Sequence, residues 1–183
     1  VDILMDADTH LLIGDGTNMR YYTSAEKAPK KYQLMIVFED DSFLAFTVSM
    51  YGSIYAFKGE FDNPYYQGSI HKLCPLDERF DKAYFISLIR NLKKDISAKA
   101  LLATEQRIPG LGNGVCQDIL FNARISPKRK ISTLSEEDID RLFNTVKSTL
   151  EEMTCRGGRD TEKDLYGALG NYRTILSKNT YHD

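Results

Sequence analysis

Short apolar runs alternate with turn-forming polar clusters through the first third of the chain. The runs at 1–5 and 10–14 flank the sequence Asp-Ala-Asp-Thr, and the apolar stretch 32–48 is divided by Glu-Asp-Asp-Ser. One more short run covers 52–57, before a connection rich in turn residues at 61–69. Short strands joined by such turns are typical of an antiparallel sheet or sandwich.

The spacing of apolar residues becomes helical from Phe80 onwards, where they recur every three or four positions. Four helices are predicted, at 80–92, 95–107, 113–123 and 133–153. The tail beyond Gly158 is predicted to be a loop with one helical turn and a final short strand. The sequence therefore predicts an α+β fold in which an antiparallel β-sandwich portion, residues 1–75, precedes a helical domain, residues 76–183.

The predicted helices carry recognisable end signals. Ser97 or Asp95 is the candidate N-cap of the second helix. Ser135 and Asp138 have the spacing of a capping box at the start of the fourth helix. The glycine pair 157–158 follows that helix and is typical of a helix end.

Composition narrows the class of protein without giving its function. Apolar residues make up 42% of the 183, which suffices for a buried core, and no apolar run is long enough to span a membrane. The net charge of −2 means that any basic surface must be local. Cys74, Cys116 and Cys155 fit neither a disulfide framework nor a metal site. We expect them to be buried apolar residues of a monomeric cytoplasmic protein.

A glycine-rich turn stands between the second and third predicted helices. Gly110, Gly112 and Gly114 remove side chains there, so that another backbone can approach closely. A helix that begins near Asn113 presents unbonded N–H groups and a partial positive charge, which suit an anion. The amide of Asn113 either caps this helix or donates to that anion.

Positive charge lies on both sides of this turn. Lys99 is on the helix that enters the turn, and a basic cluster follows the helix that leaves it, formed by Arg124, Lys128, Arg129 and Lys130. A phosphate backbone fits this arrangement. Two structural interpretations stay open: a tight connection between helices, and a solvated basic surface.

The stretch 99–143 resembles the helix–two-turn–helix segment of the formamidopyrimidine-DNA glycosylase and endonuclease VIII family. The matching features are the separation of Lys99 from Asn113, the Gly-x-Gly-Asn turn, the sequence ILFNARISP and the Leu-Ser pair that opens the next helix. Similarity extends into the Gly-Gly segment and its following loop, and more weakly back through the linker at 74–85 and the preceding strands.

The resemblance implies a base-excision DNA glycosylase with abasic-site lyase activity, which flips an oxidised base out of damaged double-stranded DNA. By position, Lys99 and Asn113 would hold phosphates beside the flipped nucleotide. The N–H groups from Gly112 to Gly114 would assist them.

Further positions follow from the same resemblance and from the charge pattern. Lys128 and Arg129 are expected DNA-binding residues of the basic cluster. Tyr51, which precedes a glycine, would be the wedge that fills the gap left by the flipped base. Asn171 and Tyr172 would belong to the loop that closes over that base.

The chain departs from the family pattern in three places. The family's nucleophile is an N-terminal proline amine followed by a glutamate, whereas this chain opens Val1-Asp2. We therefore expect no catalytic residue here and no cleavage by this chain alone. The family's zinc belongs to a C-terminal finger that would follow Asp183, so no metal or other cofactor is expected within the chain. Ser49 stands where many relatives carry an arginine, which leaves the preferred lesion open.

Two alternatives compete with the enzyme interpretation. A similar helix–two-turn–helix occurs in a small-subunit ribosomal protein and in a type II topoisomerase, so the chain is alternatively a non-catalytic DNA- or RNA-binding protein. The β-rich first part and the Tyr51-Gly52 pair argue against those relatives. In the other alternative, an interaction domain, the glycine turn has only a structural role.

Overall fold

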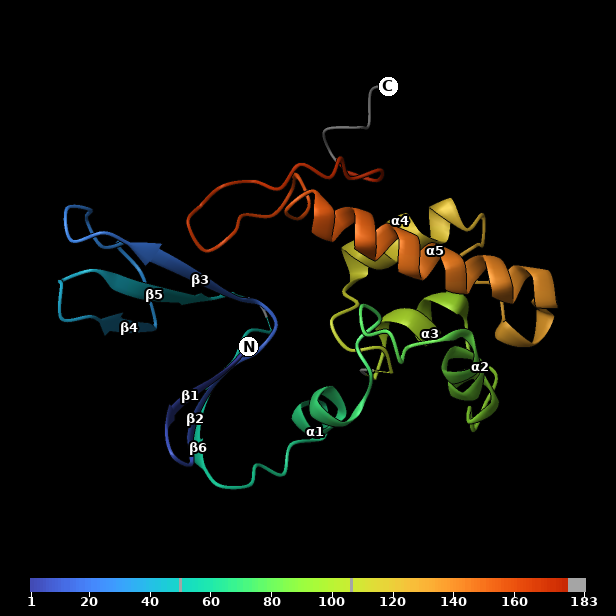
Figure 1. The fold of residues 1–183 in the computed structure, drawn as a ribbon, viewed down its shortest axis with the longest axis horizontal. Helices are drawn as coiled ribbons and strands as arrows, with labels where there is room; N and C mark the ends of the chain where they lie inside the picture. The colour runs from blue at the N-terminus through green and yellow to red at the C-terminus, as the bar shows by residue number, and fades with distance from the viewer. Residues whose placement is uncertain (50, 106, 178–183) are drawn as a thin grey trace. The chain divides into compact units, whose positions relative to one another are not determined.

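A computed structural model describes residues 1–49, 51–105 and 107–177. The chain divides into two compact units, one made of Val1–Phe61 with Glu162–Leu169 and the other of Asp62–Thr161 with the residues from Gly170 onwards. Strands occupy the first unit and helices the second, which confirms the α+β class. The expected boundary at residues 75–76 lies inside the helical unit, which begins at Asp62 and includes an unpredicted helix at Pro64–His71 (Figure 1).

Two three-stranded antiparallel sheets form the β unit. One has the order β1-β2-β6 and the other β3-β5-β4. Their bounds are β1 Asp2–Asp6, β2 Thr9–Ile13, β3 Thr17–Tyr22, β4 Leu34–Val37, β5 Phe43–Val48 and β6 Ile54–Lys58. Side chains from both sheets meet in one apolar cluster around Leu11, Ile13 and Phe46. This shared core confirms the sandwich arrangement that the alternating apolar runs predict.

Strand β3 is an element that the sequence pattern does not predict. Its residues Thr17, Asn18 and Arg20 interrupt the apolar pattern, yet the strand pairs with β5 along its whole length, from Thr17 opposite Val48 to Tyr22 opposite Phe43. Tertiary pairing overrides the weak local signal here.

The segment Glu162–Leu169 leaves the helical part of the chain and packs in the β unit. The N–H of Tyr21 donates to the carbonyl of Leu165 over 3.0 Å, and the rings of Tyr21 and Tyr166 meet edge to face. The Asp164 carboxylate accepts the N–H groups of Tyr166 and Ala168 and closes the loop on itself. The helical turn and strand expected in the tail are absent from its described part, up to residue 177.

The helical unit contains the elements α1 Pro64–His71, α2 Lys82–Arg90, α3 Ala98–Ala103, α4 Asn113–Asn122, a 3-10 turn at Ile131–Thr133 and α5 Glu136–Cys155. Apolar faces of α2 to α5 share one core, which includes Phe85, Leu101, Ile119 and Leu142. None of the helices within the described ranges is both long and apolar enough to cross a membrane.

The helix α1 replaces the turn-rich connection expected at 61–69. Asn63 caps it by accepting the N–H groups of Tyr65 and Tyr66, and Pro64 occupies its first turn. An asparagine followed directly by proline is a helix-start signal, because the proline lacks a hydrogen that would otherwise go unbonded. The same residue pair is common in turns, which is why the pattern alone favours a turn here.

The ends of α3 and α5 follow from their caps. Ser97, rather than Asp95, caps α3 through a 3.2 Å hydrogen bond from the N–H of Ala100, and the helix ends at Ala103, earlier than predicted. The capping box of Ser135 and Asp138 on α5 is confirmed.

The three cysteines do not share the buried environment that the sequence predicts. Cys116 is 1% exposed in the helical core, but Cys74 and Cys155 are exposed. Among the described residues no group of three or more His, Cys, Asp or Glu side chains could hold a metal ion.

Candidate nucleic-acid interface

The N-terminus of α4 carries backbone donors that the described residues leave unbonded. Gly112 is the N-cap and supplies no side chain, and the first N–H to find a partner is that of Cys116, which donates to the Gly112 carbonyl over 3.0 Å. Asn113 is the exposed first residue of the helix rather than its cap. Three N–H groups and the Asn113 amide are therefore available to an incoming acceptor.

Glycine suits each of the three positions in this turn for a different structural reason. Gly110 has a φ of +79°, which favours glycine whatever the available space. Gly112 has ordinary backbone angles and nothing within 4 Å of an added Cβ, so its lack of a side chain keeps the helix end open. Gly114 faces a side chain from a distant part of the sequence.

That side chain is Arg159. A Cβ added to Gly114 would stand 2.4 Å from Nη1 and 2.6 Å from Nη2 of Arg159, so the guanidinium lies directly against the first turn of α4. The guanidinium and the helix N-terminus carry charge of the same sign, and an anion placed beside them would interact favourably with both. Sequence reasoning missed Arg159, although it follows the Gly-Gly pair that ends α5.

Close backbone packing fixes the position of Arg159. A Cβ added to Gly170 would stand 2.1 Å from the carbonyl of Gly158, so these two segments touch without intervening side chains. The N–H of Gly170 donates to the Arg159 carbonyl and the N–H of Tyr172 to the Gly158 carbonyl. Gly158 itself has a φ of +101°. The return of the chain at residues 170–172 thus holds the arginine in place.

Lys99 is an exposed residue of α3, whose apolar side chains share one core with those of α4. Its N–H donates to the carbonyl of Pro127 over 3.1 Å. Burial raises the pKa of the Cys116 thiol to about 11, while the positive charge of Lys99 acts on it in the opposite direction. The positive charge of Lys99 therefore acts on Cys116, in the first turn of α4.

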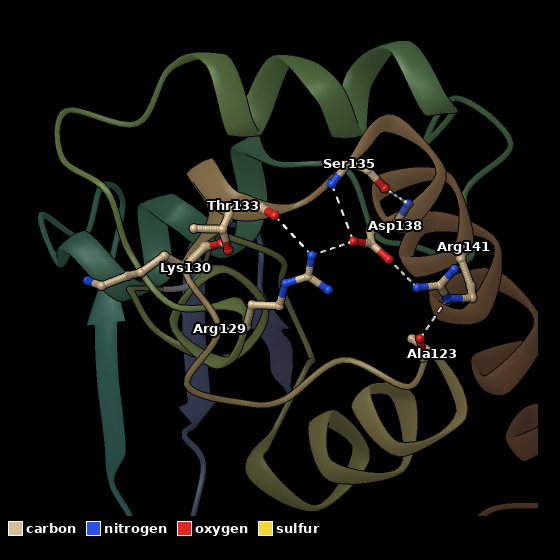
Figure 2. A network of polar contacts seen from close by, with 7 residues as sticks. All are labelled: Ala123, Arg129, Lys130, Thr133, Ser135, Asp138 and Arg141. Carbon is tan, nitrogen blue, oxygen red and sulfur yellow. Dashed lines mark hydrogen bonds and ion pairs between the residues drawn. The ribbon is translucent and has the colours of Figure 1, made fainter.

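Arg129 and Lys128 differ in their surroundings, although both are predicted to bind DNA. Arg129 forms a 2.7 Å ion pair with Asp138 and donates to the carbonyl of Thr133 (Figure 2). Lys128 is exposed and forms no ion pair with the described residues. The guanidinium of Arg129 is thus committed to an internal network, whereas the ammonium of Lys128 faces solvent.

The internal network joins three segments of the helical unit. Asp138 also binds Arg141, whose Nε donates to the carbonyl of Ala123 at the end of α4 (Figure 2). The N–H of Ser135 holds the pKa of Asp138 below its usual value, helped by the hydrogen bond of Arg141 and by the charges of Arg129 and Arg141. This carboxylate therefore fixes the basic segment against α4 and α5.

Tyr51 is presented to solvent by a constrained turn between β5 and β6. Its side chain is 91% exposed and its φ is +67°, a value that few residues other than glycine adopt. The N–H and hydroxyl of Ser49 both donate to the carbonyl of Gly16, and a Cβ added to Gly52 would stand 2.5 Å from that same oxygen. An exposed aromatic ring on a strained, well-held turn is typical of a contact residue.

Asn171 and Tyr172, expected at a base pocket, lie in different environments. Asn171 is exposed and its N–H donates to the carbonyl of Arg156. Tyr172 is only 4% exposed, and burial raises the pKa of its hydroxyl, followed by the charges of Asp118 and Glu152. Tyr172 is a buried side chain between α4 and α5. A contact of Asn171 or Tyr172 with a base stays a prediction.

Comparison with known proteins shows which family this chain resembles. The family described as "Formamidopyrimidine-DNA glycosylase H2TH domain" matches residues 73–164. The formamidopyrimidine-DNA glycosylase of Listeria monocytogenes serotype 4b is 30% identical over 86% of this chain, and that of Listeria innocua serovar 6a is 30% identical over 82%. The chain spans 58% and 56% of the lengths of these two relatives.

Solved structures share the fold. The MutM (Fpg) protein of Thermus thermophilus aligns with a TM-score of 0.72 at 24% identity, over 91% of this chain and 62% of that chain. Lactococcus lactis Fpg in complex with DNA containing an abasic site aligns with a TM-score of 0.71 at 22% identity, over 92% of this chain and 62% of that one. From the matched helix–two-turn–helix domain and this shared fold, the chain belongs to the formamidopyrimidine-DNA glycosylase family.

Proposed function

We propose that this chain is the DNA-binding portion of a base-excision DNA glycosylase with abasic-site lyase activity, acting on double-stranded DNA that carries oxidised bases. The observation that carries this proposal is the N-terminus of α4, where unbonded N–H groups and the exposed Asn113 stand beside the Arg159 guanidinium. The positive charge of Lys99 acts on the same helix turn. Oriented donors with two cations suit a phosphate group. Family membership supports DNA as the source of that phosphate.

Tyr51 would supply recognition of the damage within this function. A base that leaves the stack creates a gap, and an inserted ring offsets part of the lost stacking energy. The ring of Tyr51 is exposed, and its turn is held by Ser49 and Gly16, so little conformational freedom would be lost on insertion. Duplexes with a missing base should therefore bind more tightly than intact ones.

Residues 1–183 by themselves would not cleave DNA. The lyase step requires an amine that attacks the sugar and forms a Schiff base. The family resemblance assigns that amine to a proline followed by a glutamate, and residues 1–183 contain no such pair.

Fluorescence anisotropy with two duplexes of identical sequence tests the proposal, one intact and one containing a tetrahydrofuran abasic analogue. We expect tighter binding of the abasic duplex, and a smaller preference for it in Tyr51→Ala. Equal affinity for the two duplexes would contradict a repair function. In a separate sample, borohydride should trap no covalent adduct between residues 1–183 and a natural abasic site, and a trapped adduct would overturn the proposed inactivity.

A further inference from the structure

Two basic segments lie side by side in the helical unit, although they are far apart in the sequence. The carbonyl of Arg129 accepts the N–H of Ala98, and the N–H of Ile131 donates to the carbonyl of Ile96, both over 2.9 Å. Ser97 and Lys130 are bridge partners between the two. We call the paired segments, residues 93–99 and 126–130, the lysine strap.

The lysine strap is strongly basic in a chain that is slightly acidic. It contains six basic residues and one acidic residue, whereas the whole chain has 24 Lys and Arg against 26 Asp and Glu. The exposed cations are Lys93, Lys94, Lys99, Lys128 and Lys130. None of these five forms an ion pair with any residue in the described ranges. Positive charge is thus concentrated on this surface.

The other two charged residues of the strap, Asp95 and Arg129, form contacts within the fold. Asp95 accepts the N–H and the hydroxyl of Ser132, at 3.2 and 2.9 Å, so its carboxylate is hydrogen-bonded within the fold. Arg129 points inward to Asp138 while Lys130 points away from that network (Figure 2). Among the residues that the structure describes, the ammonium of Lys130 donates to the backbone carbonyl of Asp95 and to no side chain. The cations of the strap that face solvent are therefore all lysines.

We infer that the lysine strap is a second phosphate-contacting surface, which extends the DNA contact beyond the N-terminus of α4. This inference rests on the proposed function, because Lys99 belongs both to the strap and to the proposed phosphate site. Since Lys99 is joined to Pro127 by a backbone hydrogen bond, Lys128 is held beside the same site. Flexible ammonium groups on a fixed backbone bind successive phosphates without reading sequence.

The salt dependence of binding tests this inference. Each phosphate contact contributes about 0.9 to the slope of log K against log salt concentration for duplex DNA. We expect the triple variant Lys93→Gln, Lys94→Gln, Lys128→Gln to lower the slope by about two to three relative to the unchanged chain. These exposed side chains have no hydrogen bond or ion pair among the described residues, so the thermal midpoint should not change.

A matched triple variant controls for net charge. Lys27, Lys30 and Lys31 are exposed in the connection between β3 and β4 of the β unit. Their replacement by Gln changes the charge equally and should leave the slope unchanged. An equal decrease of the slope in both triple variants would overturn the inferred phosphate contact of the strap and indicate a general charge effect.

Two further outcomes separate the strap from the proposed function. An unchanged slope in the strap variant, with weaker binding in Lys99→Ala, would overturn the strap and leave the proposed function standing. If the unchanged chain does not bind the abasic-analogue duplex at all, the proposed function fails and the strap fails with it.

Discussion

The guanidinium of Arg159 occupies the space that a side chain on Gly114 would need, with Nη1 2.4 Å from the position of an added Cβ. A glycine in the first turn of α4 therefore admits a cation to the helix N-terminus. This contact joins the segment after α5 to the helix–two-turn–helix. Neither Gly114 nor Arg159 indicates it from the sequence.

The variant Gly114→Ala tests whether Gly114 serves DNA binding, by admitting Arg159, rather than helix stability. Alanine favours the helix by up to about 1 kcal/mol over glycine, and the clash falls on the flexible end of Arg159 rather than on backbone. We expect a thermal midpoint close to that of the unchanged chain and weaker binding of an abasic-analogue duplex. In an Arg159→Ala background the same substitution should no longer affect binding. An equal loss of affinity in both backgrounds would show that Arg159 is not the cause.

Gly112→Ser should stabilise the protein while it weakens DNA binding. A serine N-cap is better than glycine by a few tenths of a kcal/mol, and its hydroxyl would accept the N–H of Gly114 or Val115. That donor is then lost to a phosphate, and a hydrogen bond to a charged group contributes about 1.5 kcal/mol or more. We expect affinity to fall about tenfold with an unchanged or higher thermal midpoint. Unchanged affinity would mean that these N–H groups do not contact DNA.

Acid should destabilise the helical unit through its hydrogen-bonded carboxylates. The side chain of Arg79 lowers the pKa of Asp77 from 3.8 to about 2, helped by the N–H of Arg79. A folded pKa below the unfolded one means that the stabilising contribution is present above the unfolded pKa of 3.8 and is lost as the pH falls through about 2.

The variant Asp77→Asn should therefore lower the thermal midpoint at about pH 6 and have little effect at about pH 2. The matched control is Asp15→Asn, at an exposed carboxylate with no hydrogen bond or ion pair among the described residues. It should have little effect at either pH. A deficit of the same size at both pH values in Asp77→Asn would contradict this account.

Thiol reactivity should divide the cysteines into two classes. Cys74 and Cys155 are exposed, whereas Cys116 is buried and its pKa is raised to about 11. Only the thiolate reacts, so iodoacetamide at about pH 8 should modify two thiols rapidly and the third only on unfolding. Mass spectrometry of the digested protein gives the order. Rapid modification of Cys116 in the folded protein would show that its helix opens readily.

Sequence patterns predict the elements whose periodicity and caps agree, such as α5 with its Ser135–Asp138 box. They fail where tertiary pairing supplies the reason for an element, as in β3, or where a helix start resembles a turn, as at Asn63-Pro64. The predicted Lys99 lies on α3 and the predicted Asn113 begins α4. Arg159 escapes prediction because its contact with Gly114 exists only in three dimensions. The different orientations of Arg129 and Lys128 cannot be read from a run of basic residues either.

The central claim is that the N-terminus of α4 and Lys99 hold a phosphate of damaged DNA. The most direct measurement is the affinity of the double variant Lys99→Ala, Asn113→Ala for a duplex with a tetrahydrofuran abasic analogue. The matched control replaces Lys27 and Asn18, two exposed residues of the β unit, by alanine. The account predicts a loss of at least about tenfold in the first variant, equivalent to about 1.4 kcal/mol, and no loss in the control. An affinity within about twofold of the unchanged chain in the first variant would contradict it.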